Sequence, residues 1–222
     1  MPISNQQRLA ERMRKRIVEN LKSLNQADDE TDALDGDHVL NGRSRHSGAI
    51  TPAAVLVPLI ERNAGLHVLL TQRAAHLNKH AGQVSFPGGR SDPEDAHAAA
   101  TALRETEEEV GITPNFVEVV GRLDDYQTGT GFRVTPIVGF VRPEFQLTLH
   151  KAEVATTFEV PLQFIFDKRN HAIESRPWQG GERRYYIFRY QQFEIWGATA
   201  GMLINLYRRC ARGTGQHGLA QL

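Results

Sequence analysis

The stretch Gly88–Ile112, GGRSDPEDAHAAATALRETEEEVGI, decides the fold of this 222-residue chain. Its paired glycines predict a tight turn, and the alanine-rich run predicts a helix that ends at Gly111, because glycine accepts the left-handed conformation that stops helices. Asp92, before Pro93, and Asp95 are both candidate caps for the start of this helix. Helical spacing predicts a core-facing stripe made of Ala99, Ala102, Leu103, Thr106 and Val110.

Three glutamates, Glu105, Glu108 and Glu109, stand in the last turns of this helix. Their i, i+3 and i+4 spacing is expected to gather the carboxylates on a face different from the core. The position is unfavourable, because a helix C-terminus is partly negative and each carboxylate there costs about 0.3–1 kcal/mol. A solvated acidic face is the plain interpretation. The alternative is a divalent cation, and all-oxygen ligands favour Mg²⁺ or Mn²⁺ beside a glycine turn that lets metal or phosphate approach.

The segment resembles the signature of the Nudix hydrolases, G-x5-E-x7-R-E-U-x-E-E-x-G-U with U apolar. The matching residues are Gly89, Arg104, Glu105, Glu108, Glu109, Gly111 and Ile112. The interval from Gly89 to Arg104 is one residue longer than in the pattern, so its first glutamate maps to either Glu94 or Asp95. Thr106 also stands where an apolar residue is usual. The resemblance implies an α/β fold, the Nudix-type α/β/α sandwich with a mixed central sheet.

The resemblance also implies a reaction, the hydrolysis of a diphosphate bond with one to three Mg²⁺ ions. The implied metal ligands are Glu105, Glu108, Glu109 and the backbone carbonyl of Gly89. Arg104 is expected to orient the glutamates. The general base is either Glu109 or Glu153, since family members draw it from different places, and the plain interpretation of Glu153 is a solvated loop acid.

A second motif, LLTQRAAHLNKHAGQVSFPGGRSD at 69–92, resembles the coenzyme A pyrophosphatase branch of that family, LLTxRSxxLRxHxGQVxFPGGxxD. Ala74 and Asn78 depart from it, and the wider resemblance covers roughly residues 50 to 205. The implied substrate is coenzyme A or a derivative, cleaved to 4′-phosphopantetheine and adenosine 3′,5′-bisphosphate. The implied substrate-binding residues are Arg73, His80, Gln83, Gly88 and Gly89. Arg73 offers a planar fork to phosphate oxygens, with a surface ion pair as the alternative.

The composition limits the partners and the cellular compartment that are expected for the chain. Lys and Arg together number 26, as do Asp and Glu, so no global field favours nucleic acid or membrane as a partner. Cys210 is the only cysteine, which excludes an internal disulfide and fits the cytoplasm. The sequence shows neither an apolar run of membrane-spanning length nor a secretion signal.

Three parts are expected: an N-terminal helix and flexible arm over 1–49, a Nudix domain over 50–210 and a tail over 211–222. A basic amphipathic helix at 5–24, with Leu9, Met13, Ile17 and Leu21 as its stripe, packs on the domain or on a partner subunit, which leaves a homodimer open. Residues 26–49 are predicted to be a linker or mobile arm. Strands are predicted at 53–60, 66–73, 83–86, 116–123, 134–141, 145–149 and 183–190, with helices near 161–167 and 196–209.

Three other functions compete with coenzyme A hydrolysis. The first is a Nudix enzyme that acts on ADP-ribose, a dinucleotide or a nucleoside triphosphate. The second is a non-catalytic nucleotide sensor, which is expected to lack one or more of the metal glutamates. The third is an RNA-processing hydrolase, for which the balanced charge offers no groove that tracks a phosphate backbone.

Overall fold

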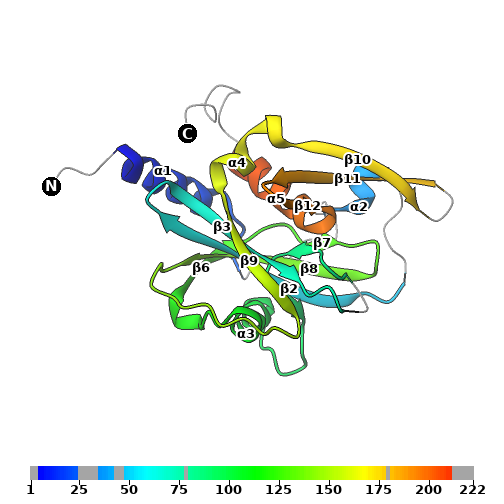
Figure 1. Ribbon diagram of the computed structural model, residues 1–222, viewed down its shortest axis with the longest axis horizontal. Helices are drawn as coiled ribbons and strands as arrows, with labels where there is room; N and C mark the ends of the chain where they lie inside the picture. The colour runs from blue at the N-terminus through cyan, green and yellow to red at the C-terminus, as the bar shows by residue number, and fades with distance from the viewer. Residues whose placement is uncertain (1–4, 25–34, 43–47, 78–79, 179–180, 212–222) are drawn as a thin grey trace.

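The computed structural model describes residues 5–24, 35–42, 48–77, 80–178 and 181–211 (Figure 1). The helices are α1 (Asn5–Asn20), α2 (Asp37–Asn41), α3 (Ala98–Val110), α4 (Leu162–Phe166) and α5 (Gly197–Ala211), with short 3-10 turns η1 (Pro114–Phe116) and η2 (Lys168–Asn170). The strands are β1 (Asp35–Gly36), β2 (Thr51–Arg62), β3 (Gly65–Arg73), β4 (Val84–Ser85), β5 (Gly88–Arg90), β6 (Val117–Arg122), β7 (Tyr126–Gln127), β8 (Phe132–Val141), β9 (Val154–Pro161), β10 (Ala172–Trp178), β11 (Gly181–Tyr190) and β12 (Phe193–Trp196).

The central sheet is mixed. Its main path runs β1-β7-β8-β2-β3-β4, with β5 paired to β2, β6 to β8 and β9 to β3. β2 lies parallel to β8 and antiparallel to β3, and the predicted hairpin between β2 and β3 is confirmed, with Arg62 opposite Gly65. A separate three-stranded sheet is formed by β10, β11 and β12.

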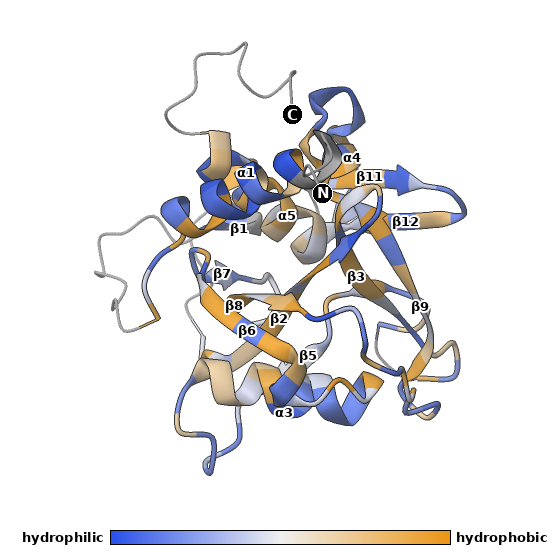
Figure 2. Cartoon of the chain, turned by 90° about the vertical axis from the view of Figure 1, so that its left-hand side faces the viewer, coloured by the Kyte–Doolittle hydropathy of each residue, from blue (hydrophilic) through white to orange (hydrophobic). Residues whose placement is uncertain are grey.

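The side chains of β2 alternate between two cores, as the two-residue period of a strand requires. Ala54 and Leu56 pack with the alanines of α3 on one face. Val57 and Leu59 join the larger core on the other face, where α1, α4, α5 and the second sheet lie. Figures 1 and 2 show α3 on one side of the central sheet and α1 and α5 on the other, with hydrophobic residues along the central strands. The expected α/β fold with helices on both faces of a mixed sheet is confirmed.

The N-terminal helix packs on its own domain. Met13 and Ile17 are buried in the larger core, and Leu21 packs against it. Arg16 donates a hydrogen bond from Nε to the carbonyl of Cys210 at the end of α5. Beyond the helix, Lys22 Nζ lies 2.9 Å from Asp124 Oδ1. No helix in the described part of the chain is long and apolar enough to cross a membrane.

The structure differs from two of the predicted segments. The stretch 145–149 forms no strand, because its backbone instead bonds to the end of α3, as Thr148 N does to the carbonyl of Val110 at 2.9 Å. The segment 26–49, predicted as a linker or mobile arm, contains β1 and α2 at 35–41. The Asn41 side chain forms two hydrogen bonds with the backbone of Arg184, which fix α2 against β11. Residues 25–34 and 43–47 of that arm lie outside the described residues.

Candidate metal and diphosphate site

Helix α3 begins with a cap that the sequence did not indicate. Neither Asp92 nor Asp95 caps it: the His97 ring accepts a hydrogen bond at Nδ1 from the backbone N–H of Ala100 at 3.0 Å. Asp95 is not available for this role, because Arg104 donates to both its oxygens, at 3.1 and 3.0 Å. Gly111 ends the helix in the left-handed conformation, as predicted.

Arg104 holds four acidic groups around one guanidinium. Besides Asp95, it lies 3.2 Å from an oxygen of Glu105 and 3.2 Å from one of Glu108, and 3.4 Å from Asp92. The hydrogen bonds from Arg104 hold the pKa of Asp95 well below its usual range. These contacts also decide which acid faces the arginine: Asp95 does, while no contact joins Glu94 to it within the described residues.

Glu109 lies at the edge of the core and not on a separate polar face. It is only 4% exposed, beside the buried Ala102, Thr106 and Val110 of the same helix. Thr106 fits this apolar position because its hydroxyl donates to the Ala102 carbonyl at 2.6 Å. Leu103, which was expected in the core, is instead half-buried. Glu105 is likewise half-buried, and Glu108 is exposed.

Burial raises the pKa of the Glu109 carboxyl to about 7, although two nearby donors oppose the shift. The backbone N–H of Gly88 donates to Glu109 Oε2 at 3.3 Å, and Arg73 Nη1 lies 3.9 Å from Oε1. Charge on Glu105 and Glu153 pushes the pKa further up. Burial also raises the pKa of Glu105, and the repulsion from Glu108 and Glu153 adds to it. The acids are therefore close enough to disfavour one another's charge.

The glycine turn gives the acids direct access to backbone. Gly88 has a φ of 149°, and a Cβ there would lie 2.5 Å from the backbone of Ala54 and Val55. A Cβ on Gly89 would lie 2.5 Å from the carboxylate of Glu105, so that carboxylate rests against the Gly89 backbone. Pairing of β5 with β2 holds this turn in place.

Arg73 ends β3 with its guanidinium turned toward Glu109. Its Nε is buried and has no hydrogen-bond partner within the described residues. The neck of the following loop is closed by two backbone bonds, Arg73 N to the Gln83 carbonyl at 2.9 Å and Gly82 N to the Arg73 carbonyl at 3.2 Å. His80 Nδ1 and Gln83 Oε1 bond at 2.8 Å, so these two predicted site residues contact each other.

Glu153 reaches the site although it is far along the chain. The segment before it bonds to the last turn of α3, with His150 N donating to the Glu109 carbonyl at 2.9 Å. The Glu153 carbonyl accepts from Ala74 N at 2.8 Å, and its side chain lies 3.4 Å from His150 Nδ1. Sequence reasoning missed His150 and Thr148 as the residues that dock this segment, and no motif marks them.

Comparison with known proteins shows which family the chain resembles. A family model described as the NUDIX domain matches residues 50–180. The chain belongs to the Nudix family. The Escherichia coli K12 protein named "Uncharacterized Nudix hydrolase NudL" is 46% identical to it over 156 residues, which cover 69% of this chain and 80% of that protein.

Solved Nudix structures resemble the chain only in outline. A MutT/nudix family protein from Enterococcus faecalis has a TM-score of 0.46 at 15% identity, covering 81% of this chain and 68% of that one. A C. elegans Ap4A hydrolase has a TM-score of 0.43 at 23% identity, covering 51% and 82%. Likeness at this level carries no argument about substrate.

The donor set fits the divalent cation that a Nudix hydrolase implies. Carboxylate and backbone carbonyl oxygens are the ligands that Mg²⁺ and Mn²⁺ prefer. As the side chains stand, no group of three His, Cys, Asp or Glu within the described residues is arranged to hold a metal ion. The reason is visible in the contacts: Arg104 engages Glu105 and Glu108, and Arg73 faces Glu109. Glu109 is buried and Glu105 half-buried, and both have raised pKa values. A cation bound between them and the glycine turn would relieve their mutual repulsion.

Proposed function

We propose that this Nudix chain is a Mg²⁺- or Mn²⁺-dependent diphosphatase that hydrolyses coenzyme A or a derivative to 4′-phosphopantetheine and adenosine 3′,5′-bisphosphate. One observation carries the proposal. The buried carboxylate of Glu109 lies 3.9 Å from the guanidinium of Arg73, and both lie beside the Gly88–Gly89 turn. A carboxylate that suits a metal ion and a guanidinium that suits a phosphate therefore lie next to each other.

Each group has a distinct task in this proposal. Glu105, Glu108, Glu109 and the Gly89 carbonyl hold the metal, which polarises the diphosphate and its attacking water when bound. Arg104 is a positioning residue, since it fixes Glu105 and Glu108 against Asp95. Arg73 donates to a phosphate oxygen, and its buried Nε, which has no partner among the described residues, supplies a donor for that purpose.

Glu153 is the proton acceptor in this proposal. Glu109 is buried and already accepts from Gly88, which suits a fixed ligand. The side chain of Glu153 is 44% exposed, so water reaches it, and its charge acts on both Glu105 and Glu109. His150 Nδ1 lies 3.4 Å from its carboxylate. Proton transfer by a positioned side chain contributes about 10²–10⁴-fold to rate.

The coenzyme A assignment is supported by where the second motif lies. Arg73, the His80–Gln83 pair and the Gly88–Gly89 turn all belong to the 69–92 segment that resembles the coenzyme A pyrophosphatase branch. The contacts bring this segment against the acids of α3 and against Glu153 through Ala74. The branch motif and the acidic helix therefore build a single site.

The decisive experiment is incubation with intact coenzyme A and Mg²⁺ and identification of both products by mass spectrometry. ADP-ribose, a dinucleoside polyphosphate and a nucleoside triphosphate form the comparison panel. Turnover of ADP-ribose equal to or better than that of coenzyme A would overturn the substrate assignment. Absence of turnover on every member with both metals would overturn the enzyme itself and favour a nucleotide sensor.

Variants separate the assigned roles. Arg73→Ala should raise KM for coenzyme A while leaving Mg²⁺ affinity within about twofold, since the loss of a charge-assisted bond to substrate acts on binding. Arg62→Ala is the matched control, because Arg62 lies on the same hairpin with similar exposure but pairs with Glu159. Glu153→Gln should lower kcat without weakening Mg²⁺ binding, and equal losses of both would make Glu153 a metal ligand.

A further inference from the structure

A cavity of about 240 Å³ lies between α2, β11 and α5, across the central sheet from α3 (Figure 1). Asp35 and Gly36 of β1 and Tyr126 of β7 complete its wall. None of the residues assigned to the diphosphate site lines it. The proposed hydrolysis therefore leaves this cavity without a role.

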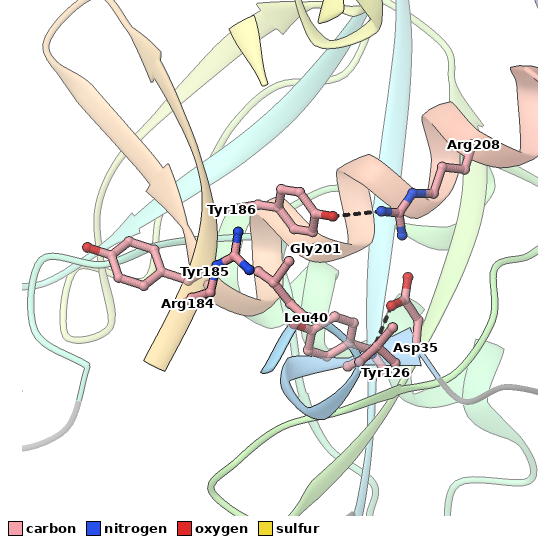
Figure 3. A pocket seen from close by; sticks show the side chains of 11 residues that line it. Asp35, Leu40, Tyr126, Arg184, Tyr185, Tyr186, Gly201 and Arg208 are labelled. Carbon is pink, nitrogen blue, oxygen red and sulfur yellow. Dashed lines mark hydrogen bonds between the residues drawn. The ribbon is translucent and has the colours of Figure 1, made fainter. Parts of the chain in front are cut away.

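Two arginines, Arg184 and Arg208, line the cavity on either side of Tyr186 (Figure 3). Both arginines are exposed, and neither guanidinium has an ion pair among the described residues. Arg208 donates to the Tyr186 hydroxyl at 2.6 Å and lies over that ring, 5.5 Å from its centroid. The Asn41 side chain bonds both the N–H and the carbonyl of Arg184, at 2.6 and 3.0 Å.

The rest of the wall is apolar with one acceptor. Val39, which is 54% exposed, and Leu40 come from α2. The Tyr126 ring lies against α5, because Gly201 has no Cβ; one there would lie 2.5 Å from the ring. Asp35 accepts hydrogen bonds from Gly36 N at 2.9 Å and from Asn205 Nδ2 at 3.1 Å, and its two oxygens retain capacity for a further donor.

We propose that this cavity binds a compact organic phosphomonoester that carries a hydroxyl group. The phosphate accepts hydrogen bonds from Arg184 and Arg208, whose planar N–H forks match phosphate oxygens. The hydroxyl donates to Asp35, and the carbon skeleton lies against Leu40 and Tyr126. The two arginines and one aspartate that line the cavity carry a net positive charge, which selects an anion. This site is independent of the proposed hydrolysis.

Ribose 5-phosphate is a suitable probe, since it combines a phosphomonoester with hydroxyl groups. Backbone amide resonances of the full ¹⁵N-labelled chain are followed during its titration, with inorganic phosphate and ribose titrated separately. Saturable shifts are expected at the amides of Gly36 and Gly201, which line the cavity, and they should persist in Arg73→Ala. Shifts confined to Gly89 would place the probe at the diphosphate site and overturn the proposal.

Variants of the two arginines test the assignment of the phosphate. Arg184→Gln with Arg208→Gln should weaken ribose 5-phosphate binding at the cavity by at least about tenfold, since two charge-assisted bonds are lost. The double lysine variant keeps the charge and should recover part of the affinity, which separates lost binding from lost folding. Unchanged affinity in the glutamine variant would overturn the proposal. Binding of ribose as tight as that of ribose 5-phosphate would also overturn it. Tighter binding of inorganic phosphate than of ribose 5-phosphate would overturn the assignment of an organic ligand.

Discussion

Glu109→Gln should stabilise the metal-free protein, and the gain should depend on pH. Burial raises the pKa of Glu109 to about 7 from its ordinary value of 4.5. The folded protein therefore binds more protons than the unfolded chain between these values, so its stability falls as pH rises through this window. The destabilisation is absent below about pH 4.5 and complete above about pH 7.

The structure sets the size of the effect. The pKa gap corresponds to about 3 kcal/mol, since one pKa unit is worth about 1.4 kcal/mol. This gap already includes the attraction between Glu109 and Arg73. Glutamine removes the cost and still offers an oxygen to Gly88 N, but its amide nitrogen would then stand in the place of Oε1, 3.9 Å from Arg73 Nη1, where two donors would face each other. A net gain of about 2 kcal/mol at pH 8 follows, which raises the Tm by about 4–8 °C for a domain of this size.

The assay is thermal unfolding in the presence of a chelator at pH 5 and pH 8. Glu107→Gln is the matched control, because Glu107 is an exposed acid on the same helix. We expect a gain at pH 8 for Glu109→Gln, a much smaller one at pH 5, and little change at either pH for the control. Addition of Mg²⁺ should stabilise the parent protein and narrow the difference. A variant less stable than the parent at pH 8, or a gain that is equal at both pH values, would refute the reasoning.

Four further substitutions test other contacts in the structure. Gly88→Ala should lower the free energy of unfolding by about 3 kcal/mol or more, since its Cβ would overlap backbone atoms at a φ of 149°. Gly89→Ala should leave the free energy of urea unfolding unchanged. It should weaken Mg²⁺ binding about tenfold, because its Cβ would displace the carboxylate of Glu105. Arg104→Lys should lower kcat about 10–100-fold with little loss of Tm, because an ammonium cannot make the two-pronged bond that holds the acids; full activity would remove its positioning role. Asp124→Asn should lower the free energy of unfolding by about 2 kcal/mol at pH 7, measured by urea unfolding. Hydrogen bonds from Arg209, Asn205 and Lys22 outweigh desolvation and hold the pKa of this carboxyl at about 2, against its ordinary 3.8. That contribution is complete above about pH 4 and is lost toward pH 2, so a difference that grows on acidification would contradict it.

Local patterns determined much of the fold. The glycine turn, helix α3 and its stop at Gly111, the hairpin of β2 and β3, and helix α5 were all predicted from residue spacing, because each depends on contacts between residues a few positions apart. The mixed sheet with helices on both faces followed from the order of these elements. Strands β9, β10 and β12 were missed. β9 depends on pairing with the distant β3, whereas β10 and β12 pair with β11, their neighbour in the chain.

Only the tertiary structure decided how the acids are arranged. Asp95 suits a helix cap by sequence, but Arg104 takes its carboxylate and leaves the cap to His97. Glu109 follows the acidic pattern of its neighbours, yet the packing of α3 on β2 buries it. Glu153 arrives through backbone bonds between its segment and the end of α3, which no spacing encodes. Sequence fixes which groups a segment offers, whereas burial and charge depend on which distant segments pack around them, and these set a carboxylate's pKa.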